Sequence, residues 1–302
     1  MFEKLRKYAL TPEHFADDQT IEWLLPNCIA KETVTLLYAE GGQGKSFVTT
    51  ALAQYALASG MKCLYLDYDN SKIAIAERGL QEKLIGSRKN IIYIHRSTTN
   101  LHASEMINNM HEGAVKGGYK DTLIVLDSLK NFFDLGNDNK ANEAMKKITD
   151  LRDAGATIII ISHTNKSGSN YQGSNNIRDA VDAMYRIEKT ESKEGELRVI
   201  LNSEKERLPV KDTALSVNVK DLSISLIDLT VARLTEADKI FIGDIKSVIA
   251  KQPGINKREL LEAAGYSIDH KQMRSKLEQF EELYWTANKG AKNATLYHLL
   301  EN

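Results

Sequence analysis

The residues best suited to chemistry lie in one short run, AEGGQGKS, at residues 39–46. The run fits the pattern G-x-x-x-x-G-K-[ST] except that Ala39 replaces the first glycine, which is harmless if that residue keeps a negative φ. The glycines let backbone N–H groups turn toward phosphate oxygens, and a following helix adds a dipole that favours anions. We expect an ATP-binding loop that consists of Glu40, Gly41, Gly42, Gln43, Gly44, Lys45, Ser46 and Phe47.

Three residues have specific expected roles at this loop. The Lys45 ammonium should reach the β- and γ-phosphates, and the Ser46 hydroxyl should bind Mg²⁺. The other half of a magnesium site is expected at Asp127, which ends the apolar run LIVLD. An Asp at the end of a buried strand beside a phosphate loop can hold the metal through water. ATP and Mg²⁺ are therefore the predicted cofactors, with Ser46 and Asp127 as metal residues.

The surrounding elements are expected to form a doubly wound α/β sheet. Apolar, β-rich runs alternate with helical patterns, as in a mostly parallel sheet covered by helices on both faces. The expected parallel strands are TVTLLY (33–38), KCLYLDY (62–68), NIIYIH (90–95), TLIVLD (122–127) and TIIIIS (157–162). After residue 183 the strands follow one another with short turns, which predicts an antiparallel extension of the sheet.

The pattern divides the chain into three zones. Residues 1–32 are expected to be a lead-in segment, and residues 33–229 the α/β core. Residues 236–302 read as three helices followed by a β-hairpin, which is the layout of a winged helix. The expected fold is therefore a P-loop core with a small winged-helix-like domain at the C-terminal end.

Bulk composition narrows the class of protein. The chain has 302 residues, a hydrophobic fraction of 42% and a net charge of -1, which is ordinary for a globular protein and gives no general support for nucleic-acid binding. It has two cysteines, too few for a disulfide framework. It shows no signal-peptide pattern and no apolar run long enough to span a membrane. A cytoplasmic location without membrane contact is expected.

These motifs resemble those of RecA-superfamily ATPases, AAA-family ATPases in the broad sense, and in particular the hexameric plasmid and phage replicative helicases of the RepA type. The lead-in IEWLLPNCIAKETVTLLYAEGGQGKS (21–46) is similar to that family's approach to its phosphate loop, and the resemblance covers roughly residues 20–228. It implies a RecA-like fold and a ring of subunits.

The resemblance also assigns roles near the nucleotide. Asp69, in CLYLDYDN, stands where the family has an acidic base that activates water, with Asp67 as a competitor and helix capping as the plain alternative. His163, in IIIISHTNK, stands where the family has a sensor of the γ-phosphate, although a lone histidine is by default structural. Lys45, Asp69, Asp127, His163 and Arg207 are thus the expected catalytic residues.

Contacts with DNA and with a neighbouring subunit are implied more loosely. The polar loop 166–176 stands where the family binds single-stranded DNA, with Lys166 on phosphate and Tyr171 stacked on a base, unless it is only a surface loop. Lys205 and Arg207 stand where the family reaches the ATP of the next subunit, unless they form only a solvated turn.

The C-terminal segment is expected to contact DNA or a protein. A recognition helix near 269–283 would expose Lys271, Arg274 and Lys276, and a wing would carry Lys289 and Lys292. Ten basic and ten acidic residues make 236–302 neutral, whereas DNA-binding modules are usually basic. Docking of a partner protein therefore stays open beside DNA contact.

The expected function is that of an ATP-hydrolysing DNA motor, a ring-forming replicative helicase that acts on single-stranded DNA. We expect the ring to be a hexamer and to work with other replication proteins. Three alternatives stay open. The chain can be a DNA-stimulated ATPase that loads or remodels a partner without unwinding. It can be a nucleotide-dependent regulatory DNA-binding protein, or a kinase-like or signalling ATPase of the same fold.

Overall fold

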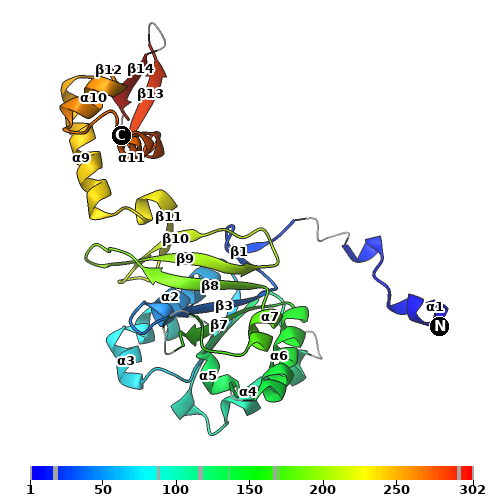
Figure 1. Cartoon of the computed structure of the whole chain (residues 1–302). Helices are drawn as coiled ribbons and strands as arrows, with labels where there is room; N and C mark the ends of the chain where they lie inside the picture. The colour runs from blue at the N-terminus through cyan, green and yellow to red at the C-terminus, as the bar shows by residue number, and fades with distance from the viewer. Residues whose placement is uncertain are drawn as a thin grey trace. The chain divides into compact units, whose positions relative to one another are not determined.

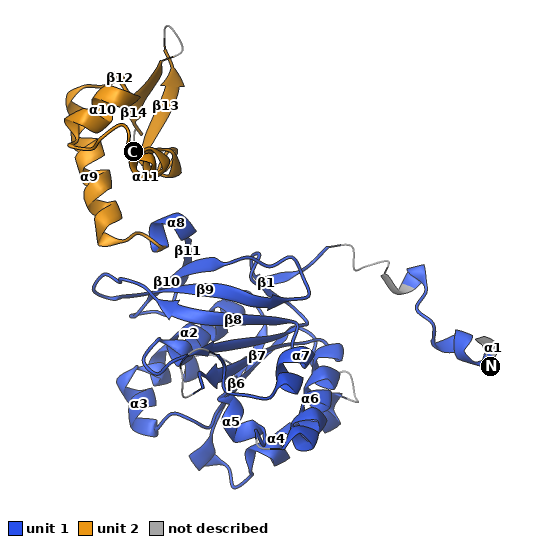
Figure 2. Cartoon of the chain, in the orientation of Figure 1, with its two compact units in different colours: residues 1–232 blue, residues 233–302 orange. Residues whose placement is uncertain are grey.

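The computed structural model describes residues 2–15, 20–86, 89–114, 118–135, 137–165, 168, 170–290 and 294–300. The chain divides into two compact units, Met1–Ala232 and Arg233–Asn302 (Figure 1 and Figure 2). No helix in the described ranges is both long enough and apolar enough to cross a bilayer.

In the described residues, the larger unit is built on a nine-stranded sheet with the order β11-β10-β9-β8-β3-β7-β6-β4-β5. Figure 1 labels the strands from β11 to β7. Strands from β8 to β5 in that order run parallel, and β9, β10 and β11 are antiparallel. The strands are β3 (Val34–Ala39), β4 (Lys62–Asp67), β5 (Ile91–His95), β6 (Thr122–Asp127), β7 (Ala156–His163), β8 (Ala183–Lys189), β9 (Glu196–Glu206), β10 (Thr213–Asn218) and β11 (Ile224–Ile227).

The predicted mixed sheet is confirmed, with one correction. Strand β8 was expected among the antiparallel strands, but it pairs in parallel with β3 and only its other edge is antiparallel, to β9. The reason is that helix α7 (Asn175–Ala180) precedes β8 and lets the chain cross over before re-entering the sheet. The extension proper therefore starts at β9.

Side chains alternate between the two faces of the sheet and build two cores. One face packs against α2 (Lys45–Ala58), α3 (Lys72–Glu77) and the π-helical turn Gln81–Ile85, and it also covers the short β1 (Trp23–Leu25) and β2 (Ile29–Ala30). The other face packs against α4 (Ala103–Ala114), α5 (Leu129–Phe132), α6 (Asp138–Asp153) and α7. This two-sided cover is why the central strands are apolar throughout.

Helix ends follow from local chemistry. Gly60 and Gly155 follow α2 and α6 with φ of 87° and 95°, a backbone conformation that favours glycine, as expected for helix C-caps. The Ser71 side chain accepts from Ala74 N and starts α3, and Asn137 does the same for α6. The unit also contains α1 (Phe2–Leu5), three 3₁₀ turns at Arg6–Tyr8, Pro12–Phe15 and Arg96–Thr98, and α8 (Leu229–Ala232).

The smaller unit consists of three helices and a three-stranded antiparallel sheet with the order β12-β14-β13. Its elements are α9 (Glu236–Lys251), β12 (Ile255–Asn256), α10 (Lys257–Ala263), α11 (Lys271–Gln279), β13 (Trp285–Lys289) and β14 (Thr295–Leu299). Phe241, Phe280 and Trp285 are almost fully buried at its centre, and Trp285 Nε1 donates to Leu277 O at 3.0 Å. The unit therefore has a core of its own.

Candidate active site

The run AEGGQGKS forms the connection between β3 and α2, the context in which such a run binds phosphate. Ala39 is the last residue of β3, and the extended backbone of a strand does not require glycine at this position. Gly42 and Gly44 have φ of 80° and 86°. A Cβ on Gly44 would also lie 2.7 Å from Leu197 Cδ2, so both its φ and its neighbour favour glycine.

Lys45 is the first residue of α2, and its side chain folds over the loop. Its Nζ donates to Ala39 O and to Glu40 O, each at 2.7 Å, and the residue is 7% exposed. Burial lowers the pKa of this ammonium, while Asp127 and Asp69 oppose that shift. Phosphate oxygens accept hydrogen bonds from an ammonium more strongly than neutral carbonyls do, so a bound triphosphate can take over these bonds.

Strand register brings the predicted site residues to one edge of the sheet. Ala39 of β3 lies beside His163 of β7, and Asp67 of β4 lies beside Asp127 of β6. Since β4, β6, β7 and β3 are consecutive strands of the sheet, these four residues lie on four adjacent strands. Ligands of open α/β sheets bind at this carboxyl edge, where the phosphate loop also begins.

Asp127 is 1% exposed and lies beside the phosphate loop. It accepts hydrogen bonds from the Ser46 hydroxyl, from Asn70 Nδ2 at 3.1 Å and from Tyr65 OH at 3.3 Å. Burial, and then the charge of Asp67, raise the pKa of Asp127 to about 6. The charged form is thus costly here unless a cation lies nearby.

The pair Ser46 and Asp127 fits a magnesium ion, because hydroxyl and carboxylate oxygens are the donors that this hard cation prefers. A divalent cation would also offset the cost of the buried charge on Asp127. When bound, Mg²⁺ would supply positive charge that partly neutralises the phosphates of the nucleotide. The residues that would hold it are those expected from the sequence.

Asp67, the competitor for the role of base, is fully buried. It accepts hydrogen bonds from Asp69 N at 3.2 Å, from Asn70 N at 2.9 Å and from Tyr93 OH at 2.6 Å. The Asn70 side chain bridges it to Asp127. Through these bonds Asp67 fixes the turn that carries Asp69, whose side chain is 25% exposed.

The carboxylate of Asp69 contacts Lys130 and His163. Its Oδ1 is 2.7 Å from Lys130 Nζ, and its Oδ2 is 3.2 Å from His163 Nε2. The hydrogen bond with His163, and then the Lys130 ammonium, hold the pKa of Asp69 well below its usual range against the effect of burial. The structure thus brings together the predicted base, in the turn after β4, and the predicted sensor, at the end of β7.

Two described residues after His163 contact the region of the phosphate loop: Thr164 N donates to Ala39 O at 3.3 Å, and Tyr171 packs beneath it. Tyr171 is 7% exposed and packs edge-on against Tyr38 with ring centroids 6.2 Å apart. In this conformation its ring is not accessible for stacking on a base, contrary to the expectation, because it fills the core under the loop. Arg186 Nη2 donates to Gly168 O at 3.3 Å. Lys166 lies outside the described residues.

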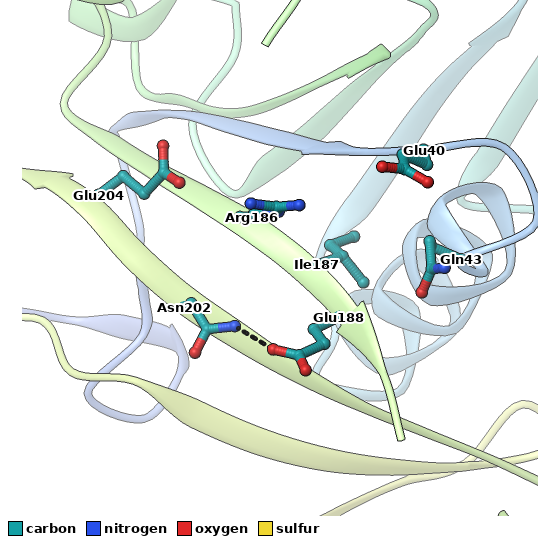
Figure 3. Close-up of a pocket in the computed structure, with 7 residues that line it drawn as sticks. All are labelled: Glu40, Gln43, Arg186, Ile187, Glu188, Asn202 and Glu204. Carbon is teal, nitrogen blue, oxygen red and sulfur yellow. Dashed lines mark hydrogen bonds between the residues drawn. The ribbon is translucent and has the colours of Figure 1, made fainter. Parts of the chain in front are cut away.

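A cavity of about 520 Å³ opens beside the phosphate loop (Figure 3). It is lined by Glu40, Gln43, Arg186, Ile187, Glu188, Asn202 and Glu204. Lys189 N donates to Gln43 Oε1 at 2.9 Å and ties the loop to β8. The glutamates that line the cavity disfavour an anion, so the triphosphate is expected on the other side, between Lys45 and Asp127.

Lys205 and Arg207 make contacts within the chain. Lys205 Nζ donates to Arg178 O at 2.5 Å and to Asp179 O at 2.8 Å, at the end of α7. Arg207 pairs with Asp182 Oδ1 at 3.1 Å and is 48% exposed. Both side chains cap α7 here, so they must leave these partners in order to reach another subunit.

In the smaller unit the predicted recognition helix corresponds to α11. Lys276 pairs with Asp238 at 2.6 Å and its side chain is 17% exposed, so the expected exposure is not found. Arg274 is half-buried and donates to Ile268 O at 2.6 Å. Both cations satisfy groups of their own unit. Lys271 and Lys289 are exposed as expected, and Lys292 lies outside the described residues.

Several residues of the site had no sequence signal of their own. The contacts of Lys130 with Asp69, of Asn70 and Tyr65 with Asp127, and of Tyr93 with Asp67 form because strands distant in sequence lie side by side. Lys130 alone has a positional hint, since it follows Asp127 by one short turn.

Comparison with known proteins identifies one family. A family model described as an AAA domain matches residues 9–169, which is more than half of the chain. No curated protein matches the chain. Among solved structures, the flagellar accessory protein FlaH from Methanocaldococcus jannaschii is 14% identical, with 66% of this chain and 91% of FlaH covered and a TM-score of 0.46. On the family match, which covers more than half of its residues, the chain belongs to the AAA domain family.

Proposed function

We propose that the protein is an ATP-driven motor on single-stranded DNA, built as a ring and acting as a replicative helicase. The observation that carries the proposal is the contact between His163 Nε2 and Asp69 Oδ2 at 3.2 Å. His163 ends β7, and the loop expected to bind DNA follows it directly. His163 therefore links a movement of that loop to Asp69, the residue expected to activate water.

The proposed chemistry uses the residues at the carboxyl edge of the sheet. Lys45, Ser46 and the loop amides bind the triphosphate, with Asp127 and Ser46 holding Mg²⁺. Asp69 orients the attacking water and accepts its proton. His163 reports the state of the γ-phosphate to the loop beyond it. Each role requires only the side chains that the structure brings to this edge.

Two further features belong to the same proposal. Arg207 of one subunit would complete the site of its neighbour, so that hydrolysis depends on assembly. The smaller unit, with three helices and a β-hairpin, would act as a winged helix that contacts DNA or a replication protein. Since Lys276 is paired with Asp238, the exposed Lys271 and Lys289 are the better candidates for such a contact.

The test measures ATP turnover with and without a single-stranded oligonucleotide. We expect stimulation of about tenfold, equivalent to about 1.4 kcal/mol of barrier. His163→Ala should bind ATP but lose the stimulation. His111→Ala is the matched control. His111 also pairs with an aspartate, Asp150, at 2.7 Å, but it lies in the last turn of α4 and not among the site residues.

The outcomes separate the alternatives. Stimulation of His163→Ala equal to that of the unmodified protein would contradict the coupling through His163. Absence of any stimulation would remove the DNA motor and favour a signalling ATPase. A strand-displacement assay then distinguishes a helicase from an ATPase that loads or remodels a partner. Stimulated turnover without unwinding indicates the second function.

A further inference from the structure

Lys130 is a cation of the active site that the proposed chemistry does not use. It lies on α5, which follows Asp127 after a single residue, and its Nζ is 2.7 Å from Oδ1 of Asp69. His163 contacts the other oxygen of the same carboxylate. Each oxygen of Asp69 therefore has its own nitrogen partner, which makes the carboxylate a weaker acceptor for a proton from water.

The fold does not depend on Lys130. Helix α5 is anchored by Leu129 and Phe132, which are 0% and 3% exposed, and Phe132 packs edge-on against Tyr68. The Lys130 side chain is 45% exposed. Ion pairs with that much solvent contact contribute little to stability. Its position over Asp69 therefore calls for another explanation.

Charges around Lys130 suggest one. Lys45 Nζ donates to Ala39 O, and Ala39 lies beside His163 in the register of β3 and β7. Since His163 contacts Asp69 and Asp69 contacts Lys130, the ammonium groups of Lys45 and Lys130 lie at the same edge of the sheet. Asp69 is the anion that pairs with Lys130 here. A terminal phosphate held by Lys45 carries more negative charge than a carboxylate and competes for the same ammonium.

We propose that Lys130 is a second lysine of the triphosphate site, which pairs with Asp69 when the γ-phosphate is absent and with the γ-phosphate when it is present. The inference rests on the proposed ATPase function and deepens it. Exchange of partners frees Oδ1 of Asp69 for the attacking water only when ATP, and not ADP, is bound. Lys130 thereby distinguishes the two nucleotides.

The experiment compares the affinities of ADP and of a non-hydrolysable ATP analogue by calorimetry. Lys130→Ala should weaken the ATP analogue about tenfold and leave ADP unchanged, and Lys130→Arg should restore most of the loss. Lys140→Ala is the matched control, because Lys140 also pairs with an aspartate, Asp134, at 3.4 Å but on α6. The control should bind both nucleotides normally.

An unchanged ratio of the two affinities in Lys130→Ala would overturn the inference. The proposed ATPase site has a separate test, since Lys45→Ala should weaken both nucleotides. If Lys45→Ala binds both normally, the nucleotide site itself is misplaced, and that failure is distinct from a failure of Lys130.

A second measurement uses Asp69→Asn, which removes the competing anion. This variant should bind the ATP analogue more tightly than the unmodified protein, and the gain should disappear when Lys130→Ala is added. Additive effects of the two changes would contradict a shared ion pair and hence the exchange.

Discussion

At the scale of single residues, the burial of Asp127 has the clearest energetic consequence. Its native pKa of about 6 lies above the ordinary value of 3.8, so the folded protein binds a proton more tightly than the unfolded chain. The contribution of Asp127 to stability is therefore largest at low pH and is lost as pH rises from about 4 to about 6. A shift of this size corresponds to about 3 kcal/mol.

Asp127→Asn should accordingly stabilise the nucleotide-free protein at pH 8 by roughly 2–3 kcal/mol and have little effect at pH 4. Chemical denaturation in the presence of a chelator, at both pH values, measures the difference. The same variant should lose the stabilisation that Mg²⁺ and ATP give the unmodified protein. A variant less stable than the parent at pH 8 would show that the hydrogen bonds of Asp127 outweigh the cost of its charge.

At the scale of elements, the connection between β3 and α2 depends on Gly44. Gly44→Ala places an alanine at a φ of 86° and brings its Cβ toward Leu197. We expect a loss of stability of about 1–2 kcal/mol, together with nucleotide affinity too weak to measure at normal concentrations. Thermal melting and calorimetry check the two effects separately.

Gly41→Ala is the matched control for stability. A Cβ on Gly41 meets no atom within 4 Å, and its φ is not positive. This variant should melt with the parent. Equal melting of Gly44→Ala and Gly41→Ala would mean that the loop relaxes freely and that the left-handed conformation at Gly44 is not required.

The elements were the part of the structure most open to prediction from sequence. The five core strands lie where their apolar runs are, because a strand covered on both faces must be apolar throughout. The phosphate loop and Asp127 are also where the motifs place them. Partners across the sheet were not predictable: the pairing of Asp69 with Lys130 depends on register between β4 and β6.

Burial was the other gap between sequence and structure. Tyr171 is in a polar loop, yet its ring packs against Tyr38. Lys276 is on an amphipathic helix, yet it pairs with Asp238. Burial would raise the pKa of Asp238, but its hydrogen bonds with Lys276 and Thr235 lower that pKa to about 2. In both cases the local sequence indicates an exposed side chain, while the fold brings it against a residue that is distant in sequence.

At the scale of the whole molecule, the proposed ring requires Arg207 to act in a neighbouring site. Arg207→Ala and Lys45→Ala should each be inactive alone, the first for lack of the arginine and the second for lack of the phosphate grip. Mixing them should restore part of the ATPase activity, because some sites then join an intact Arg207 to an intact Lys45. Turnover measured against the mixing ratio checks this.

The contacts of Arg207 within its own chain provide the contrary outcome. Arg207 pairs with Asp182 and caps α7. If that is its whole role, mixed assemblies will show no recovery, and Arg207→Ala will instead melt at a lower temperature than the parent. Size measurements with and without an ATP analogue and single-stranded DNA establish that mixed assemblies form.

The two tryptophans give the molecule an optical label in each unit. The chain has two tryptophans, Trp23 in the unit that carries the phosphate loop and Trp285 in the smaller one. Trp285 is fully buried, whereas Trp23 is partly exposed, so the two should differ in emission wavelength. With either one changed to phenylalanine, fluorescence follows a single unit as nucleotide or DNA is added. The order in which the units respond during a catalytic cycle can thus be observed without an attached dye.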